Sequence, residues 1–274
     1  MLTAAKVIAD SISPHGNRLT TLEVTFHRWV LAEFNTHRVL SRNSASSRAI
    51  PIEKQILRLM EQAAIPVEWG VNRPGMQATE LLDGAEADKA EAIWLSARDQ
   101  AVEHATALMD MGVHKQITNR LLEPFMYHTV IATGTAWQNF FAQRCSPLAQ
   151  PEIRVAAEMM QDAYLESEPQ TLGFNDWHTP YIQPDEDFDI EFAKKISVAR
   201  CARVSYLTHD GVRDPEKDLE LFERLVGADP MHASPLEHVA TPRGTLRPGG
   251  QGNFIGWQQY RHQIEKSQGI ITLR

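Results

Sequence analysis

The sequence predicts an α/β (α+β) protein with long helices, and three of its segments lead to that prediction. Residues 22–26 alternate apolar and polar side chains, as a strand with one buried face does. Residues 85–111 are rich in Ala, Glu and Lys, carry apolar residues along one side and are followed by Gly112, which is typical of a long helix and its end. Residues 151–164 begin with proline, which favours the first position of a helix.

The rest of the first half is expected to be mainly helical, because apolar residues recur there at helical spacing. Two prolines and two glycines interrupt this pattern and predict a loop. The helical stretches are expected at 27–38, at 52–64, at about 114–121 and within 125–141, and the loop at 66–76.

Three parts of the chain differ in character. Residues 1–165 form the predicted core, residues 166–195 an acidic connection that contains prolines, and residues 196–274 a C-terminal segment that completes the site. Within the last segment we expect a short element at 197–206, a helix at 214–226, a glycine-rich loop at 248–252 and a final helix at 257–266.

Composition limits the functions that are open to the chain. With 274 residues, 43% hydrophobic residues and a net charge of -8, it has the make-up of an ordinary globular protein and not that of a general nucleic-acid binder. Its two cysteines favour free thiols in a reducing compartment. The first residues lack the apolar stretch of a signal peptide, and no run is apolar enough for a membrane span, so a cytoplasmic protein is expected.

A basic loop is the most informative stretch of the chain. From Thr36 to Arg48 it holds three arginines, a histidine, an asparagine and four serines, and no acid. Guanidinium groups, hydroxyls and loop amides together form a good cradle for phosphate. Because the chain as a whole is acidic, this local positive charge predicts a small anionic ligand.

Several motifs, taken together, resemble those of the flavin-dependent thymidylate synthases. The family signature of Arg-His-Arg and spaced Ser, Asn, Ser and Arg is similar to Thr36, His37, Arg38, Ser41, Asn43, Ser46 and Arg48. Residues 112–124 resemble a second family block through Arg120, and residues 140–154 resemble a third through Arg144, Gln150 and Glu152. Segments around Ser205 and Ser234, and residues 258–262, resemble stretches that precede the signature in typical members. Here they are displaced to the C-terminus.

The resemblance implies a fold, a reaction and an assembly. The fold would be the flavin-dependent thymidylate synthase fold, a mixed sheet with long helices, assembled as a homotetramer with shared active sites. The reaction would be the reductive methylation of dUMP to dTMP. FAD would be the cofactor, and NADPH and methylenetetrahydrofolate would be co-substrates.

The resemblance also implies roles for individual residues. Arg144 would act catalytically, by stabilising negative charge on the uracil ring. The nucleotide would be bound by Ser46, Ser47, Arg48, Glu33 and, from a neighbouring subunit, Arg120. The flavin would be contacted by His37, Arg38, Asn43, Asn139, Ser205, Ser234 and Arg261, the last in place of the signature arginine that is lost at Thr36.

Departures from the family pattern leave alternatives open. The chain has Thr36, Ser44 and Ser47 where the family has arginine, an acid and glycine, and Glu33 where it usually has glutamine. A UMP or dCMP methylase or hydroxymethylase, or a nucleotide-binding protein without catalysis, would also fit. A metal-dependent phosphohydrolase would need ligands such as His232, Glu237 and His238. Their spacing matches no strong zinc pattern, so we assign no metal.

Structural roles remain alternatives for some candidates. Arg144 could form a buried ion pair with Glu152, Arg120 could be solvated, and Asn139 could be a surface amide. Cys145 is expected to be a packed thiol, because no histidine partner is evident from the sequence.

Overall fold

The structure is a computed structural model that describes residues 2–208, 213–244 and 253–270, so the glycine-rich loop expected at 248–252 lies outside the described residues. None of the described helices is long and apolar enough to cross a membrane. In chain order the elements are β1 (Ala4–Ile12), β2 (Arg18–His27), η1 (Arg28–Val30), α1 (Leu31–Asn35), β3 (Ser41–Ser44), α2 (Ile52–Glu61), α3 (Gly84–Asp110), α4 (Lys115–Thr118), η2 (Asn119–Leu121), η3 (Glu123–Phe125), β4 (Tyr127–Gly134), α5 (Gln138–Arg144), α6 (Pro151–Glu166), β5 (Gln170–Thr171), α7 (Ile190–Arg203), η4 (Val204–Tyr206), α8 (Pro215–Val226), η5 (Ser234–Glu237), β6 (Ala240–Pro242), β7 (Trp257–Gln259) and α9 (Tyr260–Ser267).

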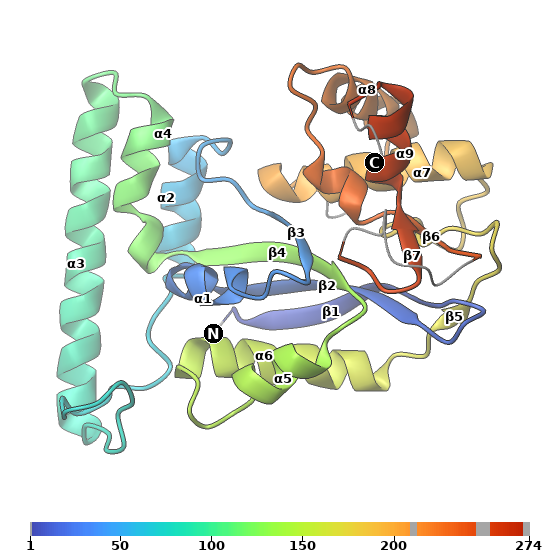
Figure 1. Ribbon diagram of the computed structural model, residues 1–274. Coiled ribbons are helices and arrows are strands. Elements are labelled where there is room, and N and C mark those ends of the chain that lie inside the picture. The colour runs from blue at the N-terminus through green and yellow to red at the C-terminus, as the bar shows by residue number, and fades with distance from the viewer. Residues whose placement is uncertain (1, 209–212, 245–252, 271–274) are drawn as a thin grey trace.

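A mixed sheet forms the centre of the fold, as the resemblance implied. Over the described residues it has five strands in the order β3-β4-β2-β1-β5. The long strands pair antiparallel, whereas β5 pairs parallel to β1. Helices α5 and α6 cover one face of the sheet, the C-terminal helices α7, α8 and α9 lie on the other side, and α2, α3 and α4 stand at one end (Figure 1).

Strand β2 is buried on both faces, although its alternation predicts one exposed face. Leu22, Val24 and Phe26 pack into the main core with residues of α5 and α6. On the opposite face, Glu23 is only 8% exposed, and its Oε2 accepts a hydrogen bond of 2.5 Å from the Tyr181 hydroxyl. The polar alternation of β2 therefore marks a hydrogen-bonded interface with the C-terminal part of the chain.

The helices expected at 52–64, 85–111, 151–164 and 214–226 are confirmed as α2, α3, α6 and α8. Three other expectations need correction. The basic loop contains the edge strand β3. Residues 125–141 are mainly strand β4, and α5 starts only near their end. The expected helix at 257–266 begins as strand β7 before α9.

Buried ion pairs hold α7 and α8 together in the C-terminal part. Arg200 bonds Asp218 at 3.0 Å and Glu186 at 2.6 Å, and Arg203 bonds the other oxygen of Asp218 at 2.6 Å. The side chain of Asp218 is fully buried, and that of Arg200 is 5% exposed. The hydrogen bond from Arg200 lowers the pKa of Glu186 below its ordinary value.

A chain of buried hydrogen bonds crosses from the sheet to the C-terminal part. His178 lies between the hydroxyls of Ser11, at 2.9 Å, and Thr21, at 2.8 Å. Thr21 contacts Thr133 at 2.7 Å, and Thr133 contacts His238 Nδ1 at 2.7 Å. Burial lowers the pKa of both imidazoles to about 3, so both are neutral at physiological pH.

We expect the protein to lose stability steadily below about pH 6.5, the ordinary histidine pKa. His128, His178 and His238 each have a pKa near 3 in the folded state, mainly because of burial. Unfolding lets each take up a proton, so the free energy of unfolding falls by about 2 kcal/mol per histidine on going from neutral pH to about pH 5. Urea unfolding at these two pH values measures this loss.

A second pH step provides the control. Above about pH 7.5 the three imidazoles are neutral in both folded and unfolded chains, so they add no pH dependence there. A free energy of unfolding that stays constant from neutral pH to about pH 5 would contradict the neutral buried state.

Candidate functional site

Arg144, at the end of α5, is held by three acceptors from α1 and the turn that follows it. Its Nε donates to His37 Nε2 at 2.8 Å, and its Nη2 donates to the Thr36 hydroxyl at 3.1 Å and to the Glu33 carbonyl at 3.3 Å. The His37 ring packs at 82° to the ring of Phe140, also of α5, with 4.9 Å between ring centroids. His37 is only 5% exposed. Its pKa is lowered mainly by burial, and to a smaller extent by the positive charges of Arg144 and Arg42.

A pocket of about 750 Å³ lies beside Arg144, and we name it the Arg144 pocket. Three tryptophans contribute to its wall: Trp29, Trp69 and Trp94. Glu33 lines it too, and Glu33 Oε2 is buried without a hydrogen-bond partner within the described part of the chain. The pocket therefore combines flat apolar walls with two arginines and three glutamates, which suits a polar ring.

The alternative ion pair between Arg144 and Glu152 is absent. Glu152 instead accepts hydrogen bonds from the Val67 amide at 3.0 Å and from Gln150 Nε2 at 2.9 Å. Within residues 2–208, 213–244 and 253–270, no carboxylate pairs with Arg144. Its positive charge is thus not cancelled by a neighbouring acid.

Asn43 on β3 gathers polar groups from distant parts of the sequence. Its Nδ2 donates to the Cys201 carbonyl at 2.7 Å, and its Oδ1 lies 3.4 Å from the hydroxyls of both Ser205 and Ser234. The Ser46 amide donates to the Ser205 carbonyl at 2.9 Å. Four predicted site residues from the basic loop and the displaced segments therefore meet on one side of the sheet.

A third group of predicted residues meets at a carboxylate that the sequence analysis did not single out. Glu123 Oε1 accepts hydrogen bonds from the Ser47 hydroxyl and from Arg120, both at 2.7 Å, and lies 3.3 Å from Arg28. Arg48 is exposed next to Ser47. Glu123 lies in the Gly112 to Pro124 block but carries no motif of its own, so only the folded chain reveals its contacts.

The remaining predicted residues stand outside these three groups. Arg38 is exposed, and exposed Asn139 accepts a hydrogen bond of 3.3 Å from Gln143. Arg261 bonds Glu237 and, at 2.7 Å, Glu265.

Neither the three residues considered as metal ligands nor Cys145 form a site in the described chain. His232 is exposed, whereas His238 is buried against Thr133 and Glu237 pairs with Arg261. No group of three His, Cys, Asp or Glu side chains among the described residues is arranged to hold a metal ion. Burial raises the pKa of the Cys145 thiol, which suits a packed thiol.

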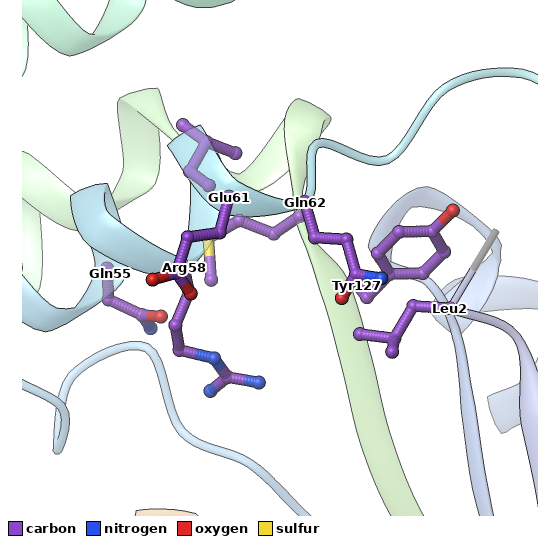
Figure 2. Close-up of a pocket in the computed structure, with 8 residues that line it drawn as sticks. Leu2, Gln55, Arg58, Glu61, Gln62 and Tyr127 are labelled. Atoms are coloured by element: carbon purple, nitrogen blue, oxygen red, sulfur yellow. The ribbon is translucent and has the colours of Figure 1, made fainter.

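A smaller pocket of about 160 Å³ contains no predicted site residue. Figure 2 shows Gln55 and Arg58 of α2 on one side of it, and Tyr127 and Leu2 on the other. Gln55 is 1% exposed, and its Oε1 has no partner within the described residues. Helical periodicity places Gln55 on the buried side of α2, but no motif distinguishes it from other polar helix residues.

A comparison with protein families supports the resemblance. The family model described as thymidylate synthase complementing protein matches residues 13–170. No curated protein matches the chain. A solved structure of the UMP/dUMP methylase PolB from Streptomyces cacaoi bound with 5-Br dUMP is similar, with 16% identity, a TM-score of 0.48, and coverage of 60% of this chain and 90% of that chain. Thymidylate Synthase X from Helicobacter pylori with FAD and dUMP is similar with 18% identity, a TM-score of 0.39, and coverage of 53% of this chain and 67% of that chain.

The family match spans the basic loop, the block that contains Arg120 and the block that contains Arg144. It ends before Ser205 and Ser234, which the fold nevertheless brings to Asn43 of the basic loop. The chain belongs to the thymidylate synthase complementing protein family, the flavin-dependent, nucleotide-methylating enzymes that its motifs resemble.

Proposed function

We propose that this protein methylates C5 of dUMP to give dTMP, with FAD as cofactor and with methylenetetrahydrofolate and NADPH as co-substrates. The observation that carries the proposal is Arg144, which lines a pocket large enough for a nucleotide base and has no acidic partner in the described chain. Attack by C5 requires negative charge to develop on the pyrimidine ring. A guanidinium that is already fixed at the pocket wall stabilises that charge without the reorganisation that bulk water needs.

The donors around Asn43 fit the polar parts of a flavin. An amide and two hydroxyls converge there. Elsewhere among the described residues, buried His238 Nε2 and His262 Nδ1 lack partners. When bound and reduced, the flavin supplies the hydride of the reaction. The contribution of the chain is to bind the ribityl and phosphate groups through side chains such as Asn43, Ser205 and Ser234.

We propose a homotetramer in which each active site draws residues from more than one subunit. In one chain, the residues around Arg144, Asn43 and Glu123 form separate groups. The residues proposed to hold the nucleotide phosphate, Ser47 and Arg120, share the carboxylate of Glu123 and not a contact with Arg144. A neighbouring subunit that brings these groups together would complete the site.

An anaerobic NADPH titration of the FAD-reconstituted protein tests the proposed function. We expect NADPH to bleach the flavin absorbance faster when dUMP is present, because the nucleotide completes the site. Mass spectrometry after addition of methylenetetrahydrofolate should then detect dTMP. A protein that binds no flavin, or whose reduced flavin yields no methylated nucleotide, would contradict the proposal.

Glu33 fits a cytosine nucleotide as well as a uracil nucleotide. Its carboxylate can only accept hydrogen bonds when ionised, and Oε2 has no partner in the described chain. Both the N3–H of uracil and the amino group of cytosine could donate to it. Product analysis with dUMP, UMP and dCMP offered separately distinguishes these substrates, and methylation or hydroxymethylation of dCMP alone would replace the dUMP assignment.

A further inference from the structure

We propose that His37 and Thr36 are positioning residues, which orient Arg144 through neutral hydrogen-bond acceptors and leave one of its nitrogens free for the ligand. The inference rests on the proposed function only for what Arg144 does to the substrate. The orientation itself is a property of this chain. In this proposal His37 holds the side chain of Arg144 in place, whereas the family resemblance implied that His37 contacts the flavin.

The hydrogen bonds of Arg144 show which of its N–H donors are occupied. A guanidinium carries five N–H groups, one on Nε and two on each terminal nitrogen. The Nε donor is taken by His37, and those of Nη2 by the Thr36 hydroxyl and the Glu33 carbonyl. Within the described chain Nη1 keeps both of its donors, and Arg144 lines the pocket. The anchored nitrogens fix the plane of the guanidinium, so Nη1 is the group presented to a ligand.

His37 can accept this hydrogen bond only as the neutral tautomer with its proton on Nδ1. Three features favour that state: the ring is 5% exposed, it packs against Phe140, and the charges that face it from α5 and β3 are the cations Arg144 and Arg42. The acid on α1, Glu33, bonds Arg144 through its backbone carbonyl. A neutral acceptor orients the guanidinium without cancelling its charge.

Thr36 acts in the same way through its hydroxyl. The hydroxyl donates its proton to the Glu33 carbonyl at 2.6 Å, which leaves a lone pair to accept from Arg144 at 3.1 Å. An arginine, which the family signature has here, carries no acceptor and could not make the second bond. The threonine at position 36, where the family has arginine, therefore helps this chain to hold Arg144 in place.

A double-mutant cycle tests the positioning role. In the FAD-reconstituted protein we expect Thr36→Val to lower kcat for dUMP methylation on the order of 10²-fold with little change in KM, since small displacements of catalytic groups cost about this much. Thr36→Ser keeps the hydroxyl and should retain activity. In the Arg144→Gln background, Thr36→Val should have no further effect. Unchanged kcat in Thr36→Val, or an equal loss in both backgrounds, would overturn the proposal.

The state of His37 gives a readout that does not depend on activity. In protein labelled with 15N-histidine, the ring nitrogens of His37 should report the neutral Nδ1–H tautomer at neutral pH. Arg144→Gln removes a nearby cation and should raise the pKa of His37. A cationic ring, or a proton on Nε2, would overturn the inference even in an active enzyme. The expected tautomer in a protein that methylates no pyrimidine nucleotide would refute the proposed function and leave the orientation of Arg144 intact.

Discussion

Replacing Arg144 with glutamine is expected to lower kcat for nucleotide methylation by at least about 100-fold, the usual cost of losing one preorganised charge at a reacting group. The guanidinium is uncompensated by any acid in the described chain and is fixed at the pocket wall, so its effect is greatest when charge develops on the ring. The binding of dUMP should weaken much less. Single-turnover formation of methylated nucleotide and calorimetric titration with dUMP measure the two effects separately.

Arg154 provides a matched control for this experiment. It lines the same pocket, but it pairs with Glu68 at 2.9 Å, which offsets its charge. Arg154→Gln should therefore retain most of the activity. If Arg144→Gln kept wild-type turnover, or if both variants lost it equally, the catalytic role of Arg144 would be refuted.

Replacing Asp218 with asparagine is expected to lower the free energy of unfolding by about 3–5 kcal/mol, the usual cost of breaking a buried ion pair from one side. The carboxylate is fully buried and bonds both Arg200 and Arg203. Among the described residues, an asparagine of almost the same shape would leave Arg200 paired only with Glu186, and Arg203 without its acid. Urea unfolding measures the loss.

The loss should also affect the proposed flavin site. Helix α7 supplies the Cys201 carbonyl that holds Asn43, and η4 follows α7 with Ser205. We expect the Asp218→Asn protein to release FAD more readily on dialysis. The exposed pair of Asp185 and Arg213 gives the control, and Asp185→Asn should leave the unfolding curve unchanged. An Asp218→Asn protein as stable as the wild type would show that the buried pair adds nothing to the fold.

Helices were easier to predict from this sequence than strands, and the reason is physical. Helical residues contact neighbours three and four positions away. The amphipathic pattern of α2 or α8 can therefore be recognised within a short stretch of the sequence. Strand β4 is buried on both faces, and its sequence Tyr-His-Thr-Val-Ile-Ala-Thr-Gly lacks the regular alternation that marks a strand with one exposed face. Strand β3 reads Ser-Arg-Asn-Ser and is a strand only because it pairs with β4.

The candidate site also contains some residues that the sequence predicted and others that only the structure revealed. The motifs identified the family and the candidate residues, including Arg144 and the basic loop, because spaced residues in a fixed order can be read from sequence alone. Glu123 and the walls of the Arg144 pocket were not predicted, since isolated glutamates and tryptophans form no pattern. The roles of the predicted residues remain predictions for the experiments above.

The sequence by itself determined the family, the strong helices and the set of polar residues available for catalysis. Only the tertiary structure decided which of them meet: Arg144 bonds His37 across 107 positions, and Ser205 reaches Asn43 across 162. Such contacts depend on how α5 packs beside α1 and how the C-terminal part covers the sheet. Hydrogen bonds act over about 3 Å, whereas sequence patterns report only neighbours along the chain, so contacts of this kind exist only once the core has formed.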